Sequence, residues 1–181
     1  EILRREIEDL QRMLGSSSPE VLQCKYSLAS GLARTGQHAE AVPLFQECLE
    51  NLISTKGPTD PGTLTMRENL IGCLQGMGSP EEALAEYRVL LVDYESLFPA
   101  DHPEVAMCRF HIGSVLSDLE RHQEAFDEIS TALAIHQSLY GKHHPGTLAC
   151  GRIKVASLLD LGEFETAAKL GEPLLEDHLQ A

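Results

Sequence analysis

The sequence has no tryptophan, few aromatic side chains, no long apolar run and no surplus of positive charge. Aromatic residues make up 5% of the 181 residues, and 28 Asp and Glu against 14 Lys and Arg give a net charge of -14. A nucleic-acid-binding protein needs a basic face to neutralise phosphate, and the cytoplasmic leaflet of a membrane is itself negative. No apolar run approaches the roughly 18 residues of a membrane-spanning helix. We therefore expect neither nucleic acid nor a membrane as the partner.

Paired cysteines and catalytic motifs are lacking as well. The five cysteines are odd in number and form no C-x-x-C pair, so they indicate neither a disulfide framework nor a zinc site. Free thiols fit a reducing compartment, which predicts a cytoplasmic protein. The adjacent His143 and His144 are spaced unlike a metal pair, and no phosphate-binding loop or nucleophile elbow is found. We expect no metal, no other cofactor and no enzymatic activity.

What the sequence does have is a repeat of 42 residues. One column of the repeat is proline in every copy: Pro19, Pro61, Pro103 and Pro145. Further columns hold alanine or leucine: Ala41, Ala83, Ala125 and Ala167, and Leu32, Leu74, Leu116 and Leu158. A turn column holds Gly36, Gly78 and Gly162, with Glu120 in the third copy. Such periodicity indicates a repeat protein, not a globular domain with a single core.

Each period predicts two helices. The proline suits the first helical position, where its missing N–H costs nothing, and the residue before it serves as N-cap. Ser18 and Asp60 are good caps there, whereas His102 and His144 are weaker ones. The pattern predicts repeats at about 19–57, 61–99, 103–141 and 145–181, within a single domain over 1–181. Residues 1–14 match the second helix of a repeat, as a capping helix or a half-repeat. We favour the half-repeat, which indicates a piece of a longer protein.

The repeat resembles the tetratricopeptide repeat (TPR), and its length of 42 residues narrows the resemblance. The segments Phe98-Pro-Ala-Asp-His-Pro-Glu-Val105 and Leu139-Tyr-Gly-Lys-His-His-Pro-Gly-Thr-Leu148 are similar to the inter-repeat segments of kinesin light chains. The resemblance implies an all-α, right-handed α-solenoid whose first helices line a concave peptide-binding groove. The paired asparagines typical of that groove are absent except for Asn69, and so is the carboxylate clamp of chaperone-binding TPR domains. The resemblance therefore implies no particular ligand.

A helical wheel divides the first helix into a core face and an opposite face. The columns of Val21, Cys24, Leu28 and Leu32 form the predicted core. The predicted groove lies opposite and combines aromatic anchors with polar side chains: Tyr26, Arg34, Glu68, Asn69, Met107, Phe110, His111 and Arg152. Such a mixture suits a peptide with apolar anchors. Alternatively, Tyr26 and Phe110 pack against neighbouring repeats.

Charge is distributed unevenly between the two kinds of helix. All of the excess acid lies in the second helices, which predicts a solvated outer face, whereas the first helices are balanced. One column of the first helix is unexpectedly basic: Lys25, Arg67 and Arg109. Their stems could cover the core edge while the charged ends pair with acids on adjacent helices. The alternative is a basic ladder that binds an acidic peptide; we favour the packing interpretation.

The leading functional hypothesis is a scaffold or adaptor module that binds a protein or peptide in the concave groove, without catalysis. The alternative is a regulatory or oligomerisation domain of a larger enzyme, such as a TPR-containing signal-transduction ATPase. The half-repeat at the start of the chain motivates this alternative. The oligomeric state does not follow from the sequence.

Overall fold

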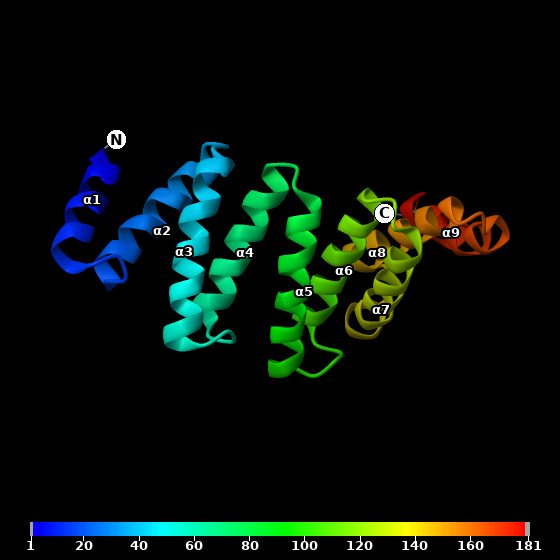
Figure 1. Cartoon of the computed structure of the whole chain (residues 1–181). Coiled ribbons are helices and arrows are strands. Elements are labelled where there is room, and N and C mark those ends of the chain that lie inside the picture. Colours follow the sequence, from blue (N-terminus) through cyan, green and yellow to red (C-terminus); the bar gives the residue numbers. More distant parts are fainter. Residues whose placement is uncertain (1, 180–181) are drawn as a thin grey trace. The chain divides into compact units, whose positions relative to one another are not determined.

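The computed structural model describes residues 2–179, with side chains described for residues 3–171. Within this range the chain forms helices only, and consecutive helices are joined by short turns (Figure 1). The helices are α1 (Ile2–Leu14), α2 (Pro19–Arg34), α3 (His38–Lys56), α4 (Pro61–Gly76), α5 (Pro80–Leu97), α6 (Pro103–Asp118), α7 (His122–Tyr140), α8 (Pro145–Asp160) and α9 (Phe164–Leu179). The all-α helical-repeat fold of the solenoid class is therefore confirmed. Each of the four repeat prolines is the first residue of a helix, and a second helix follows each of these.

The first helix of every repeat begins at its proline and is capped by the residue before it. The Ser18 hydroxyl accepts a hydrogen bond from a first-turn N–H at 3.3 Å, and the Asp60 carboxylate accepts one at 2.9 Å. His102 and His144 cap their helices through Nδ1, at 3.2 and 3.1 Å. Each of these ring nitrogens must be unprotonated to accept the bond. The two histidines are thus true caps, although imidazole is uncommon at this position.

The turn inside each repeat requires a left-handed residue after the first helix. Gly36, Gly78 and Gly162 adopt φ values of 77°, 70° and 80° there. In the third repeat Glu120 takes the same conformation with φ 57°, and it is the one non-glycine residue with positive φ in the described range. A side chain in this region costs free energy that glycine does not. The turn geometry is therefore kept even where the residue does not favour it.

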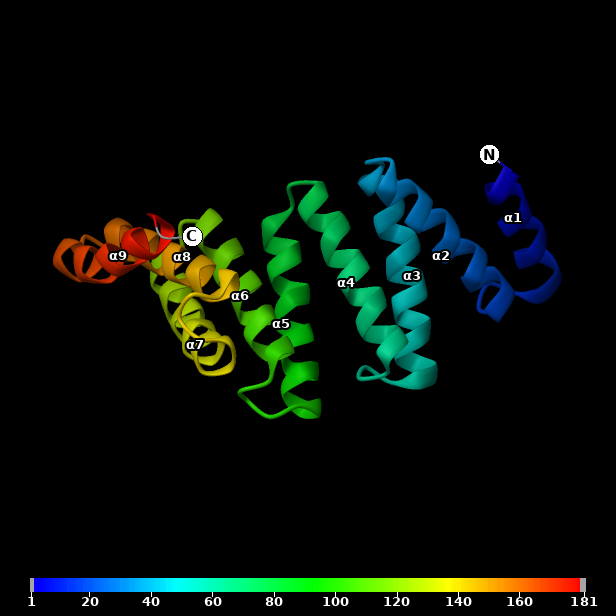
Figure 2. The same ribbon diagram turned by 180° about the vertical axis from the view of Figure 1, so that it is seen from behind.

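The chain divides into two compact units, and the boundary falls inside α5, between Glu86 and Tyr87. In unit 1, α1, α2, α3 and α4 pack consecutively, each against the next; in unit 2, α6, α7, α8 and α9 do the same, and α6 also packs against α8 (Figures 1 and 2). Each unit has its own core. The expected single domain over 1–181 and the right-handed superhelix stay predictions. Within the described range, every helix is too short or too polar to cross a membrane.

The structure confirms most of the predicted core face of the first helices and corrects it in the first full repeat. Leu70, Leu74, Ile112 and Leu116 are almost completely buried, as predicted. Cys24 and Leu28, at the same columns of the first full repeat, are only half-buried, which corrects the prediction there.

The column of Ala29, Ile71 and Gly113 is buried although it was not assigned to the core. A Cβ atom on Gly113 would come within 2.4 Å of the Ile129 side chain, so α6 and α7 approach each other closely at this point.

Candidate binding site

Four of the eight predicted groove residues lie in unit 1, on α2 and α4. Arg34 and Glu68 are exposed, whereas Tyr26 and Asn69 are half-buried. The Tyr26 ring packs edge-on against Phe45 of α3, with ring centroids 6.2 Å apart and planes at 64°. Tyr26 is therefore fixed on one side by its own repeat while part of it stays accessible.

The other four predicted groove residues lie in unit 2, on α6 and α8. Met107 and Arg152 are exposed, and Phe110 and His111 are half-buried. Phe110 packs on the core cluster that α7 and α8 contribute. His111 stacks on Tyr87, with ring centroids 5.5 Å apart and planes at 12°. Burial lowers the pKa of His111, which favours the neutral ring at pH 7.

Both aromatic residues, Tyr26 and Phe110, pack on the core of their own unit, but neither becomes fully buried. The groove assignment and the alternative of packing against neighbouring repeats both stay predictions. None of the eight predicted residues is buried, so all of them can be reached from solvent. Their role as ligand contacts stays a prediction.

The basic column packs as the preferred interpretation predicts. Lys25 and Arg67 are 4% and 5% exposed, and their charged ends pair with Glu47 and Glu86 of the second helices. Arg109 pairs with two glutamates, Glu95 at 2.5 Å and Glu128 at 2.6 Å. These cations are occupied within the repeat interfaces and are not available as a ladder. Lys25 and Arg67 are also more deeply buried than expected for side chains at the edge of the core.

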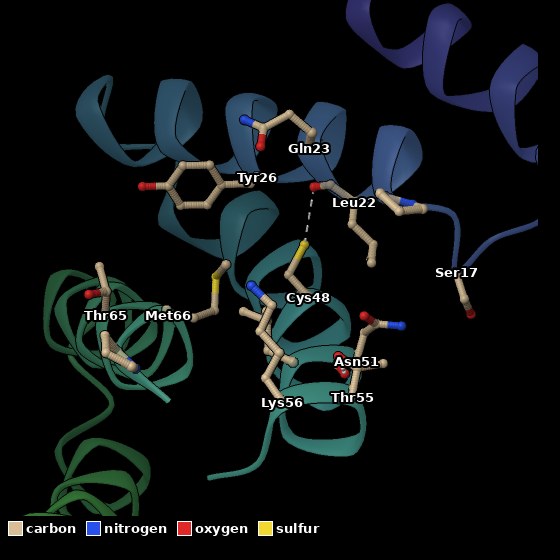
Figure 3. A pocket seen from close by; sticks show the side chains of 14 residues that line it. Ser17, Leu22, Gln23, Tyr26, Cys48, Asn51, Thr55, Lys56, Thr65 and Met66 are labelled. Atoms are coloured by element: carbon tan, nitrogen blue, oxygen red, sulfur yellow. Dashed lines mark hydrogen bonds between the residues drawn. The ribbon is translucent and has the colours of Figure 1, made fainter. Parts of the chain in front are cut away.

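One concavity of unit 1 was not expected from the sequence. It is a pocket of about 790 Å³, open to solvent on one side and lined by α2, α3 and α4 (Figure 3). Apolar side chains supply much of its wall: Leu22, Tyr26, Leu52 and Met66, with Pro19 and Pro61. The polar lining comes from Gln23, Asn51, Thr55, Thr65 and the ammonium of Lys56. Tyr26 is the one predicted groove residue in this wall.

Cys48 contributes a thiol to the pocket wall, but not a reactive one. Its Sγ lies 3.6 Å from the carbonyl oxygen of Leu22, to which it donates a weak hydrogen bond (Figure 3). Burial raises the pKa of Cys48 to about 11, so the thiol stays protonated at neutral pH. Cys73, Cys108 and Cys150 are buried too, and all five cysteines are free thiols. These buried thiols therefore serve as small apolar side chains in the core.

Helices α6, α7 and α8 of unit 2 repeat the same arrangement with different side chains. His136 and Tyr140 occupy the columns of Leu52 and Lys56. The His136 ring is 3% exposed, with its centroid 5.7 Å from that of Tyr140. Burial, and after it the nearby His144, lowers the pKa of His136.

The first helix of the next repeat carries a glycine near these side chains in both units, and the space around that glycine differs between the units. A Cβ on Gly146 would lie 3.2 Å from the His136 ring, whereas a Cβ on Gly62, the matching glycine of unit 1, would meet nothing within 4 Å but the cap Asp60. In unit 2 the His136 ring thus lies against the facing helix at the position where unit 1 has its pocket.

Comparison with known proteins places the chain in a family. Sequence models of the tetratricopeptide repeat match residues 20–91 and 105–146, which together make up more than half of the chain. The chain belongs to the tetratricopeptide repeat family. No curated protein matches the sequence.

Solved structures share the TPR fold over nearly the whole chain. Putative kinesin light chain TPR-like repeats of Podosopora anserina are 20% identical, with 98% of this chain and 84% of that chain covered at TM-score 0.78. BtubC (BKLC) from P. vanneervenii is 19% identical, with coverage of 98% and 71% and TM-score 0.76. A Rap protein complexed with Competence and Sporulation Factor is 14% identical, with coverage of 97% and 46% and TM-score 0.61. In fold, the repeats are of the kinesin light chain type.

As a family, TPR arrays are typically non-catalytic modules for protein interaction, and the membership of this chain supports a role in protein interaction in general. In the part of the chain that the structure describes, no group of three or more His, Cys, Asp or Glu side chains could hold a metal ion. His144, one of the two adjacent histidines, caps α8 and stacks on Tyr140 with centroids 4.6 Å apart.

The pocket residues on α3 were missed because the wheel was drawn for the first helices alone. A signal for them does exist in the repeat columns. The column of Leu52 holds Tyr94 and His136 in later repeats, and the column of Lys56 holds Phe98 and Tyr140. Only the first full repeat lacks an aromatic side chain in both columns. Comparing these columns would have indicated an unfilled repeat interface.

Proposed function

We propose that this TPR chain binds a partner peptide along the surface of its first helices, without catalysis. The observation that carries the proposal is the setting of Tyr26 and Phe110. These aromatic residues occupy the same column in units 1 and 2, are held on one side by the core and remain half-exposed. Rigid, partly accessible aromatic rings with polar neighbours are typical anchors of peptide interfaces.

Charge supports the choice of surface. The exposed Arg34 and Arg152 lie on α2 and α8, and neither pairs with a carboxylate among the described residues. The basic column that includes Lys25 does not form a competing site, because its side chains pair with glutamates of the same chain. A peptide therefore meets free guanidinium groups on the first helices, where they can pair with its carboxylates. A Rap protein with the same fold has been solved in complex with Competence and Sporulation Factor, which supports a ligand-binding role for this fold.

The test uses peptides selected for binding to the full chain from a displayed library, with affinity measured by fluorescence anisotropy. The double variant Tyr26→Ala/Phe110→Ala should lose about tenfold or more in affinity, because large aromatic anchors dominate such interfaces. Arg34→Glu/Arg152→Glu changes exposed side chains alone and should weaken acidic peptides. Val92→Ala, at an exposed apolar position of the second helix α5, is the matched control and should bind normally.

Because Tyr26 and Phe110 also pack, thermal unfolding of each variant must be measured. Selected peptides that bind the folded double variant and the charge-reversed variant as tightly as the parent chain would disprove the groove assignment.

A further inference from the structure

We propose that the pocket between α2, α3 and α4 binds a small amphiphilic carboxylate, with its apolar body in the pocket and its carboxylate on Lys56. The proposal concerns a site in unit 1 and does not depend on the peptide groove. It rests on the size of the pocket, on its lining and on a difference between the repeats.

The pocket exists because one repeat interface lacks its aromatic filler. In unit 2 the columns of the inter-repeat turn form ring contacts: Phe98 stacks on His102 at 4.0 Å between centroids, and Tyr140 stacks on His144 at 4.6 Å. In unit 1 the column of Phe98 and Tyr140 holds Lys56. The backbone turn is kept, since Asp60 caps α4 as the two histidines cap their helices. The space normally taken by rings is therefore left to a ligand.

The pocket is too large for one protruding side chain. A cavity on the order of 150 Å³ already holds a benzene molecule. The pocket has about 790 Å³, within the range of small-molecule sites in proteins, roughly 300 to 1,000 Å³. Residues from three helices of a single unit line it. Its size thus favours a whole small ligand over a single anchor residue of a peptide.

The lining specifies the chemistry of that ligand. Leu22, Leu52 and Met66 face an apolar body, while Lys56 is the one charged residue among those that line the pocket. The Lys56 side chain extends from the end of α3 across the pocket (Figure 3), and no carboxylate of the described residues pairs with it. Since no Asp or Glu lines the pocket, an anion there is attracted to the ammonium without a competing internal partner.

The neighbouring carboxylates of α3 do not line this pocket. Glu47 and Glu50 line a smaller, adjoining cavity, where Glu47 pairs with Lys25. An amphiphile with a cationic head would therefore be repelled at Lys56 and find no carboxylate in the pocket. This difference between head groups is the specific consequence of the proposal.

The experiment uses the full chain and dodecanoate as the probe, below its micellar concentration, with dodecyltrimethylammonium as the matched cationic probe. Methyl NMR of the four methionines gives a local readout, because Met66 lines the pocket, whereas Met77 and Met107 do not. Dodecanoate should shift the Met66 methyl signal at micromolar concentrations and leave the Met77 and Met107 signals unchanged. Dodecyltrimethylammonium should bind Met66 roughly tenfold more weakly.

Two variants test the apolar space of the pocket and the charge of Lys56 separately. Leu52→His/Lys56→Tyr introduces the pair present in unit 2 and should weaken dodecanoate binding about tenfold or more by filling the pocket. Lys56→Met keeps an apolar stem and should remove the preference for the anionic probe, with roughly a threefold to fivefold loss of affinity. Lys142→Met is the matched control, because Lys142 is an exposed lysine of unit 2.

An unmoved Met66 signal at about 1 mM dodecanoate would overturn the proposal. So would equal binding of the two probes, or full binding by the filled variant. If a peptide selected for the groove shifts Met66 while dodecanoate does not, the pocket is a peptide anchor and the proposal is wrong. Failure here leaves the groove test with Tyr26→Ala/Phe110→Ala unaffected, since that test scores peptides and not amphiphiles.

Discussion

The two units have the same repeat architecture but differ in the side chains at their repeat interfaces. The comparison is between α2, α3 and α4 of unit 1 and α6, α7 and α8 of unit 2. Unit 1 leaves a pocket beside Gly62 and holds its buried Lys25 with one glutamate. Unit 2 fills the matching space beside Gly146 with an aromatic ring and holds Arg109 with two glutamates. One backbone pattern thus supports both a closed interface and an open one. The side chains in a few columns decide which of the two results.

The largest expected effect comes from the ion pairs. Glu47→Ala leaves the ammonium of Lys25, 4% exposed, without its carboxylate and should lower the free energy of unfolding by about 3 kcal/mol. Glu128→Ala should cost about 1 kcal/mol, because the more exposed Arg109 keeps Glu95. Urea unfolding of the full chain measures both changes, and hydrogen exchange assigns each of them to its unit.

Glu50→Ala is the control for the ion pairs, because this exposed glutamate is on the same helix as Glu47. Its free energy of unfolding should change by less than about 0.5 kcal/mol. Equal costs for Glu47→Ala and Glu128→Ala would show that the second glutamate of unit 2 gives no protection.

The next effect comes from opening the filled interface. The double variant His136→Leu/Tyr140→Lys gives unit 2 the residues of unit 1 and should lower the free energy of unfolding by about 2 kcal/mol, through lost ring packing. Faster hydrogen exchange should appear in α7 and at the start of α8. Leu139→Ala, at the exposed residue beside Tyr140, should have little effect. An unchanged unfolding curve for the double variant would mean that the aromatic filler does not stabilise unit 2.

The smallest effect compares the turns inside the repeats. Glu120→Gly should raise the free energy of unfolding by about 1 kcal/mol, because Glu120 has φ 57° at a position where glycine is unstrained. Gly36→Glu, the reverse change in unit 1, should lower it by a similar amount, since Gly36 has φ 77°. Thermal unfolding monitored by circular dichroism measures both. A loss of stability in Glu120→Gly would show that the Glu120 side chain contributes more than its backbone costs.

Much of the fold could be predicted because the helix signals are local. Proline at the first position of α2, with Ser18 before it, marks a helix start through backbone sterics and capping, and both act within a few residues. The site was harder to predict. The wheel placed Tyr26 and Phe110 on the accessible side, but it misjudged the depth of Lys25, because burial depends on what the next helix contributes.

The sequence by itself determined the repeat, the helix pairs, the acidic second helices and the absence of a basic face, because periodicity and charge are properties of the chain. Only the tertiary structure decided which interfaces are filled. Whether Lys56 lies over a pocket or His136 packs against Gly146 depends on side chains that consecutive helices bring together in space. Packing of this kind follows from volume and shape in three dimensions. It left a pocket in unit 1 and placed the His136 ring beside Gly146 in unit 2.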